Sequence, residues 1–431
     1  MIYSIVRPLA RIAAYVFYRK IYLSHLENIP KDKPVVLAAN HPTAFAEPVI
    51  LACYLGRPLH FLVRGNLFKK PIYNFLLQSL NMLPLFRQKD RGYKYVKENY
   101  STFETCFDAL QEDKTIMILA EGRTIHEKRL RPLQKGTGRI AFGSLDKYPE
   151  LEDVYVVPTG VNFTYGDQAR SEVMIDFGPP MSTRAYYAQY QENNSLGIAK
   201  FTEDLTEKMS ERIIIIDDPA DEVLTEQLFL LDRSLRLKPL WPVVFKDNES
   251  TPLFREKTIA TAVNEMPAED KKSLAYKTAA YFHKLEELNI PAHSSLEKRT
   301  PFLLSFFLLL FGLPLFIGGY LLNIIPARFA KFMADTRVKF IEFYAPVWLA
   351  VGMGAFLIYY LLGLTVSLIV GKAWLIALVI ATPFLGYLAL LYREYYFIFV
   401  EDYQLNWIHP EDLASLQNQK ENILREIDRW K

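Results

Sequence analysis

The sequence predicts an α/β domain with a helical insert and C-terminal transmembrane helices, and three observations lead to this fold class. Residues 25–215 alternate short apolar runs with amphipathic segments and turn residues, which is the pattern of an α/β domain. Residues 216–300 are polar and charged, with helical periodicity. Residues 301–400 contain three long runs without a charged residue, and each reaches the ~20 residues that cross a bilayer core.

The composition limits the class of protein. The 431 residues are 51 % hydrophobic and 14 % aromatic, which is rich for a soluble protein. The net charge of +2 gives no indication of a nucleic-acid binder. The two cysteines, Cys53 and Cys106, form neither a disulfide framework nor a metal-type spacing, which fits a reducing compartment. Two ordinary, partly buried cysteines are the more common explanation of such a pair.

Residues 1–24 are predicted to form an amphipathic helix in the membrane interface. Apolar residues recur there at helical spacing, interrupted by Arg7, Arg11, Arg19 and Lys20. In a basic amphipathic helix the cations face anionic lipid headgroups. The segment lacks the uninterrupted apolar stretch and small-residue cleavage site of a signal peptide. The alternative is a helix that packs on its own domain.

Within residues 25–215 we predict five strands and three helices. The strands are expected at 34–40, 59–64, 115–120, 154–160 and 173–177, and the helices at 72–80, 95–111 and 137–145. The strand candidates are short apolar runs between turn residues, and the helix candidates have a period near 3.6. Residues 216–300 are expected to be a helical connector, with a substrate lid as the alternative, and residues 401–431 a cytosolic helix.

The membrane region, residues 301–400, is expected to hold two transmembrane helices. The runs 343–371 and 373–392 lack charge and would form a hairpin that turns at Lys372. The run 301–325 has basic residues before and after it, so a full crossing would place them on opposite sides, against the positive-inside rule. Its glycines and Pro314 also favour a break. We therefore expect a re-entrant or interfacial hairpin at 301–325, with three full spans as the alternative.

His41 is the first residue that points to chemistry. It follows an apolar strand, and Glu47 comes six residues later. A carboxylate can fix the tautomer of an imidazole and leave the other ring nitrogen basic. With an ordinary pKa near ~6.5, such a histidine can deprotonate an alcohol at neutral pH. Taken alone, a histidine beside a glutamate is more often a capping or packing residue.

Other polar residues also follow apolar runs. Glu121-Gly122-Arg123 ends a strand, where ligands of α/β folds bind, and an arginine fork suits phosphate. Considered by itself, the Glu121-Gly122-Arg123 segment is better explained as a surface turn at the end of a strand, with a Glu–Arg pair. Gly65 and Arg87 close two further apolar segments, and Lys135 precedes a Gly-Thr-Gly helix start that can present N–H groups to an anion.

The order of these segments resembles the glycerolipid acyltransferase family, which includes lysophosphatidic acid and glycerol-3-phosphate acyltransferases. The family blocks are matched, in order, by Asn40-His41, by Gly65 and Phe68 with Pro84 and Arg87, by Glu121-Gly122, and by Val157-Pro158. The resemblance spans residues 35–165. The chain departs from it at Ala46, where the family has aspartate, and at Arg123-Thr124, whose order is inverted.

The resemblance implies an enzyme in which His41, oriented by Glu47, removes the proton of an acceptor hydroxyl. Arg87 and Arg123 would hold the acceptor phosphate, Glu121 and Gly122 would shape the acceptor loop, and Gly65 and Lys135 would complete the substrate site. No metal or bound cofactor is expected. The co-substrate would be acyl-CoA or acyl carrier protein, the acceptor a glycerophospholipid, and the active site would face the cytoplasm from the membrane.

Three hypotheses follow from this resemblance. The first is a membrane-bound 1-acylglycerol-3-phosphate O-acyltransferase-like enzyme of phospholipid biosynthesis, acting on lysophosphatidate or glycerol-3-phosphate. The second keeps the chemistry but transfers the acyl group to another lyso-lipid or an amino-acid lipid, because the irregular Glu121-Gly122-Arg123 block meets the phosphate. The third is a non-catalytic membrane scaffold of the same fold, suggested by Ala46.

Overall fold

The chain folds into two compact units. A computed structural model describes residues 2–85, 98–236, 240–247, 250–297, 299 and 301–430. The first unit comprises Met1–Ile214, Val243–Thr251 and Ala334–Ala350. The second comprises Ile215–Pro242, Pro252–Met333 and Val351–Lys431.

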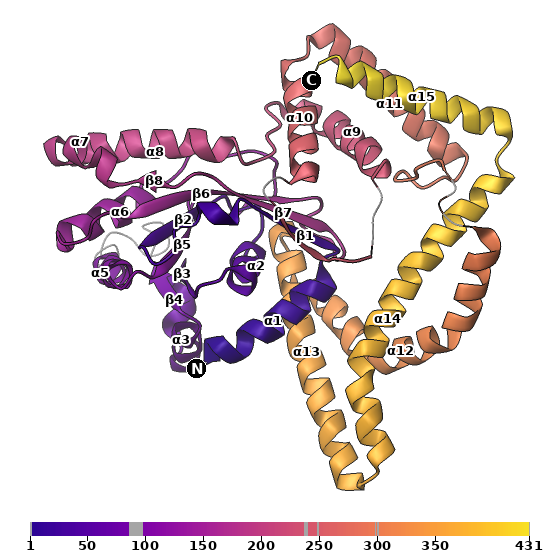
Figure 1. The fold of residues 1–431 in the computed structure, drawn as a ribbon, viewed down its shortest axis with the longest axis horizontal. Coiled ribbons are helices and arrows are strands. Elements are labelled where there is room, and N and C mark those ends of the chain that lie inside the picture. Colours follow the sequence, from indigo (N-terminus) through magenta and orange to yellow (C-terminus); the bar gives the residue numbers. More distant parts are fainter. Residues whose placement is uncertain are drawn as a thin grey trace. The chain divides into compact units, whose positions relative to one another are not determined.

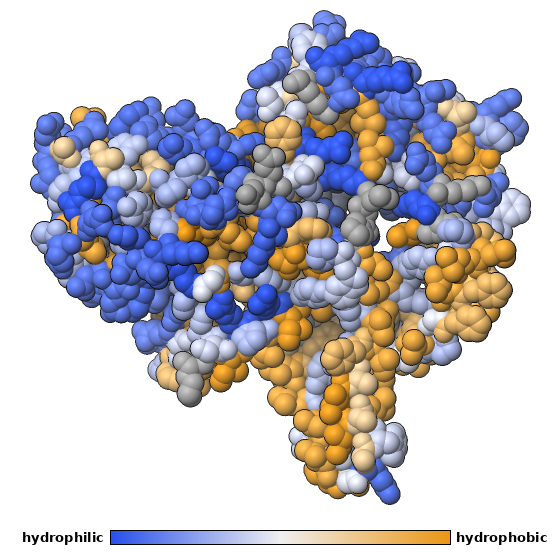
Figure 2. All heavy atoms as spheres, in the orientation of Figure 1, coloured by the Kyte–Doolittle hydropathy of each residue, from blue (hydrophilic) through white to orange (hydrophobic). Residues whose placement is uncertain are grey.

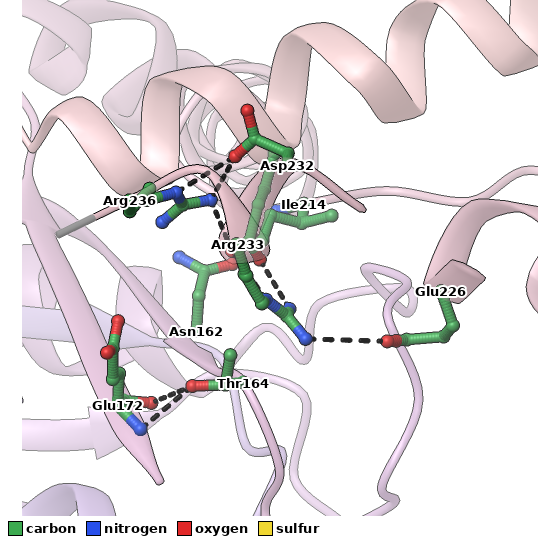
Figure 3. Close-up of polar contacts among 9 residues, drawn as sticks. Asn162, Thr164, Glu172, Ile214, Glu226, Asp232, Arg233 and Arg236 are labelled. Carbon is green, nitrogen blue, oxygen red and sulfur yellow. Dashed lines mark hydrogen bonds and ion pairs between the residues drawn. The ribbon is translucent and has the colours of Figure 1, made fainter. Parts of the chain in front are cut away.

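A hydrogen bond holds the end of the stretch Met1–Ile214 against the first unit. The side chain of Asn162 accepts this bond from the N–H of Ile214 at 2.9 Å (Figure 3).

A mixed sheet forms the centre of the first unit (Figure 1). In the described residues its strands are β1 Lys20–Ser24, β2 Val35–Ala39, β3 Leu59–Arg64, β4 Met82–Leu85, β5 Thr115–Leu119, β6 Tyr155–Phe163, β7 Glu172–Phe177, β8 Met181–Ser182 and β9 Val244–Asp247. Their order is β4-β3-β5-β2-β6-β7-β1-β9, with β8 beside β6. The strands from β4 to β6 pair in parallel, whereas β7 runs antiparallel to β6. The carboxyl ends of β2, β3 and β5 therefore share one edge.

Helices cover both faces of this sheet (Figure 1). They are α1 Ile2–Phe17, α2 Ala46–Tyr54, α3 Pro71–Ser79, α5 Glu98–Gln111, α6 Gly136–Lys147, α7 Tyr187–Glu192 and α8 Asn194–Ser210. The side chains of Val35, Leu37 and Ala39 lie in the core cluster with residues of α1 and α2. Because side chains alternate along a strand, Val36 and Ala38 are buried on the opposite face, toward α6.

The five predicted strands are all present, but two expected helical segments contain strands. The helix expected over residues 1–24 ends at Phe17, and Lys20–Ser24 is the buried strand β1. Lys20 is only 2 % exposed although it carries an ammonium group. Its ammonium lies 5.2 Å from the ring centroid of Phe245, and this cation–π contact helps a lysine to be accommodated in the sheet. In the segment expected to be a helical connector, Val244–Asp247 forms β9 and pairs with β1.

The second unit contains a helical part with a buried ionic network. Its helices are α9 Glu222–Ser234, α10 Thr251–Glu265, α11 Ala268–Glu287 and α15 Pro410–Asp428. Both nitrogens of the Arg233 fork bind Glu256, at 2.9 and 2.8 Å. Figure 3 shows a second interaction of Arg233, with Glu226, and the pair formed by Arg236 and Asp232. The contacts of Arg233 and Arg236 with Glu256 join α9 to α10.

Among the described residues, three helices are long and apolar enough to cross a membrane, judged by length and composition only. They are α12 Phe302–Arg337, α13 Ile341–Val370 and α14 Ala373–Gln404. Large apolar side chains are exposed along them, including Phe311, Ile369 and Phe384, and Figure 2 shows a hydrophobic surface on the projecting ends of α13 and α14. The break expected within 301–325 does not occur, because α12 continues as one helix through Pro314 and Pro326.

Candidate active site

His41 lies directly beyond the carboxyl end of β2 and is 6 % exposed. Its backbone N–H donates to Oε1 of Glu121 at 2.9 Å, and its carbonyl accepts from the N–H of Ile125 at 3.3 Å. The N–H of Ala120 donates to the carbonyl of Ala39 at 2.8 Å. The segments that follow β2 and β5 are therefore tied together, which places His41 and Glu121 side by side at the edge predicted to bind ligand.

Asn40 holds the other side of the same turn. Its side-chain amide donates to the carbonyl of Val161 at 2.9 Å, and its side-chain oxygen accepts from the N–H of Val161 at 2.7 Å. Asn40 is buried, and this two-point contact fixes the backbone just before His41 to β6. In the Asn-His pair, the asparagine therefore fixes the backbone, and this fixed backbone sets the position of the histidine ring.

Glu47 lies in the first turn of α2, on the Nδ1 side of the His41 ring, and is fully buried. Its carboxylate accepts from the backbone N–H of Thr43 at 2.5 Å and from the Thr43 hydroxyl at 2.8 Å. Oε1 of Glu47 lies 3.8 Å from Nδ1 of His41, and this buried Nδ1 has no hydrogen-bond partner among the described residues. The two side chains face each other as predicted, but the distance exceeds that of a hydrogen bond.

Thr124 lies at the opposite edge of the His41 ring from Glu47. Its hydroxyl lies 2.6 Å from Nε2 of His41, which is hydrogen-bonding distance. The sequence had drawn attention to Thr124 only through its inverted order with Arg123, so this contact was missed. A hydroxyl at Nε2, with a carboxylate toward Nδ1, is the arrangement required to deprotonate an alcohol.

Position 122 needs a glycine, both because of its backbone conformation and because of its close neighbours. It has a φ of +70°, a conformation that glycine adopts without steric cost. A Cβ added there would lie 2.8 Å from Cγ of Gln134. Gln134 is held at this point because its N–H donates to the carbonyl of Ala120 at 2.8 Å. The close approach brings the start of α6 to the end of β5.

The remaining predicted residues have different surroundings. Gly65 is buried at the carboxyl end of β3, on the shared edge of the sheet. Lys135 is the exposed N-cap of α6, whose start at Gly136 agrees with the predicted Gly-Thr-Gly helix start. Arg123 is also exposed. Arg87 lies outside the described residues.

A cavity lies away from His41. It has a volume of about 400 Å³ and is lined by residues of α1 and α2 that include Arg7, Arg11 and Cys53. None of the predicted site residues lines it. Burial raises the pKa of the Cys53 thiol to about 11, so the thiol stays protonated at neutral pH. In the described part of the chain, no group of three or more His, Cys, Asp or Glu side chains could hold a metal ion.

Glu121 gives a prediction about pH, because burial raises the pKa of its carboxyl above the ordinary value of 4.5. The folded state then binds more protons than the unfolded state, so this group lowers stability as pH rises from 4.5 through the folded pKa. Glu121→Gln should remove this part of the pH dependence and retain the acceptor for the His41 N–H. Thermal unfolding of both proteins across this pH range measures the effect; parallel pH profiles for the two would contradict it.

Comparisons with known proteins agree with the resemblance predicted from the sequence. Residues 20–162 match the family model described as Acyltransferase. Glycerol-3-phosphate O-acyltransferase 1 of Saccharomyces cerevisiae is 31 % identical over 91 residues, which is 21 % of this chain and 12 % of that protein. Glycerol-3-phosphate O-acyltransferase 2 of the same yeast is 25 % identical over 121 residues, which is 27 % of this chain and 16 % of that protein.

Among solved structures, the 1-acyl-sn-glycerophosphate (LPA) acyltransferase PlsC from Thermotoga maritima is similar over 49 % of this chain and 80 % of that one, with a TM-score of 0.35 and 18 % identity. The chain spans less than a fifth of the length of the two yeast relatives. The matched segment contains His41, Glu47, Glu121 and Gly122 at the shared edge of the sheet. Residues 20–162 of the chain are therefore similar to the acyltransferase family, and the chain's similarity to individual proteins is to glycerolipid acyltransferases.

Proposed function

We propose that this protein transfers a fatty acyl group from an acyl thioester to the hydroxyl of lysophosphatidate or glycerol-3-phosphate. The observation that carries the proposal is the position of His41 between a hydroxyl and a carboxylate. Thr124 Oγ1 lies 2.6 Å from Nε2, and Glu47 Oε1 lies 3.8 Å from Nδ1. The similarity to glycerol-3-phosphate O-acyltransferases supports the choice of acceptor class.

In the proposed reaction the acceptor hydroxyl takes the position of the Thr124 hydroxyl at Nε2. His41 removes its proton as the oxygen attacks the thioester carbonyl. The tetrahedral intermediate then expels the thiolate, which receives the same proton from His41, so the ring returns to its neutral form. Glu47 stabilises the transient imidazolium, and a shift of less than about 1 Å would bring Oε1 within hydrogen-bonding distance of Nδ1.

Substrate binding is proposed at the same edge of the sheet. Arg123 and Lys135 are exposed there, next to the tight turn at Gly122 and the start of α6. Arginine forks and helix N-termini both suit phosphate. Arg87 remains a proposed phosphate ligand from the family pattern. The thioester donor is acyl-CoA or acyl carrier protein, and the site would face the cytoplasm.

A panel of acceptors tests this function. Purified protein in detergent would receive labelled acyl-CoA or acyl carrier protein with lysophosphatidate, glycerol-3-phosphate, their dephosphorylated forms, another lyso-lipid and an amino-acid lipid. We expect turnover with a phosphate-bearing acceptor and a loss of at least tenfold without the phosphate, because one charge-assisted contact contributes about 1.5–3 kcal/mol. Turnover that ignores the phosphate would overturn the proposed acceptor and favour another lyso-lipid. No turnover with any acceptor would favour a scaffold.

A further inference from the structure

The two ends of α12 lie in different surroundings, and each is fixed by contacts within one unit. At its start, Arg299 binds Glu401 at 2.7 Å and Asp402 at 3.2 Å, at the end of α14. The ring centroid of Phe302 lies 5.5 Å from that of Phe399. The start of α12 and the end of α14 are therefore held together. Just before α12, the carbonyls of Ser295 and Leu296 accept from Lys420 and Gln417 of α15, which ties this end to the helical part of the second unit.

At its other end, α12 joins the acyltransferase domain. The Tyr344 hydroxyl donates to Asp335 near the end of α12. The first turns of α13 belong to the domain core, since Ala345 and Leu349 are buried in its apolar cluster. The N–H of Ala44 donates to the carbonyl of Glu342 at 2.9 Å. The end of α12 and the start of α13 thus lie at the domain that holds His41.

Between its ends, α12 runs along α14 in the opposite direction. Its contacts move steadily toward the start of α14: Ser305 with Tyr395, Leu309 with Tyr392, Gly319 with Leu385, and Asn323 with Thr382. A Cβ at Gly319 would lie 2.1 Å from the Leu385 carbonyl oxygen, so only glycine allows this approach. The Asn323 amide is fully engaged, donating to Gly319 and Thr382 carbonyls and accepting from the Tyr360 hydroxyl.

Asn323 lies near the middle of the membrane helices. Thr382 is halfway along the charge-free run 373–392, about 15 Å of helix from either end at 1.5 Å per residue. A hydrocarbon core is ~30 Å thick, so this position is close to the midplane. From Asn323 to Asp335 the helix advances about 18 Å, which is enough to return to the surface it left. Pro326 follows Asn323, and α12 is strongly curved in Figure 1.

The chain before α12 determines on which side its ends lie. Among the described residues up to Arg299, none forms a helix that could span a membrane. The acyltransferase domain and the helical part of the second unit, joined directly at Ile214 and Ile215, must therefore be on one side. Since one end of α12 is bound in each, both ends of α12 are on that side.

We propose that α12 is a re-entrant helix that enters the bilayer to the level of Asn323 and returns to the same surface, so that only α13 and α14 cross. The exposed residues of its returning half fit an interface, with Arg328 and Lys331 beside Phe329 and Phe332. The bilayer partner of this half is an anionic headgroup layer on the side of His41. Gly371 and Lys372 are on the opposite side.

Cysteine labelling of the full chain in sealed membrane vesicles tests this topology. The background is Cys53→Ala with Cys106→Ala, both native thiols being buried. Single cysteines replace Glu297, Arg337 or Lys372, with Lys70→Cys marking the side of the acyltransferase domain; all four positions are exposed. A membrane-impermeant maleimide is added before or after permeabilisation. We expect positions 70, 297 and 337 to react from one side and 372 from the other.

Each other pattern overturns the proposal. Position 337 reacting together with 372 would show that α12 crosses the membrane. Position 372 reacting together with 70 would show that the α13–α14 hairpin does not cross. Lys339→Cys repeats the measurement two residues beyond Arg337, in case that variant is poorly produced. The labelling requires no acyl transfer, so its outcome is independent of the proposed function.

Discussion

His41→Ala is expected to abolish acyl transfer almost completely, with a fall in kcat of about 10²–10⁴-fold, the usual contribution of a general base. The ring is held between Thr124 and Glu47, and its backbone is fixed by Glu121, so the substitution removes the basic nitrogen from the position that the acceptor hydroxyl is proposed to meet. Initial rates with labelled acyl donor and the best acceptor of the panel measure the loss.

Fold controls accompany this variant, because His41 is buried. Its backbone contacts survive the substitution, so circular dichroism and the unfolding midpoint should remain close to those of the parent. His41→Gln keeps the volume and hydrogen-bonding capacity but has no basic nitrogen, and it should be as inactive as the alanine variant. Activity of His41→Ala equal to that of an active parent would show that another group is the base.

Glu47 is expected to have a smaller effect on the same assay, because it acts through His41. Glu47→Gln retains the acceptor for Thr43 but loses the charge that would stabilise an imidazolium. Its pH–rate profile should shift relative to the parent, which a purely structural role of the Thr43–Glu47 contacts would not produce. If the profile is unchanged, Glu47 serves as a helix-start residue, which was the alternative explanation from the sequence.

The sheet was largely predictable because each strand carries a local signal. Val35–Ala39 and Thr115–Leu119 are continuous apolar runs, and burial on both faces of a parallel sheet requires such runs. Strands β1 and β9 were missed for the opposite reason. Lys20 and Lys246 interrupt their apolar pattern, and their pairing joins residues more than 200 positions apart, which no local periodicity encodes.

In the candidate site, the order of motifs led to His41, Glu47, Glu121 and Gly122, and the structure brings these four residues to one sheet edge. The contacts of Thr43 and Thr124 were not predictable, because a threonine hydroxyl in a loop has no characteristic spacing. A departure from the family pattern also has a structural counterpart. Glu47, one position later than the family aspartate, lies 3.8 Å from His41 rather than at bonding distance.

Glu256→Ala is expected to give the largest loss of stability, about 3–5 kcal/mol, because it removes one partner of a buried ion pair. Glu256 is fully buried, and Arg233 is only 4 % exposed. The carboxylate accepts from Arg233 at 2.9 and 2.8 Å and from Arg236 at 3.1 Å. Hydrogen exchange of the backbone amides of α9 and α10 measures the local free energy of opening.

Two matched variants show whether burial is the cause. Glu226 also pairs with Arg233, but at 3.9 Å and with a side chain 29 % exposed (Figure 3). Glu226→Ala should therefore cost less than about 1 kcal/mol, as exposed pairs do. A cost for Glu256→Ala as small as that of Glu226→Ala would contradict the prediction.

The double variant Arg233→Met with Glu256→Met separates the energy of the pair from the cost of an unpaired charge. Two apolar side chains of similar volume leave no buried guanidinium without its carboxylate, and Arg236 retains Asp232 at 2.9 Å. The double variant should therefore be more stable than Glu256→Ala, since replacing a whole buried pair by apolar groups is often neutral. A double variant no more stable than Glu256→Ala would mean that the geometry of the pair itself stabilises the packing of α9 on α10.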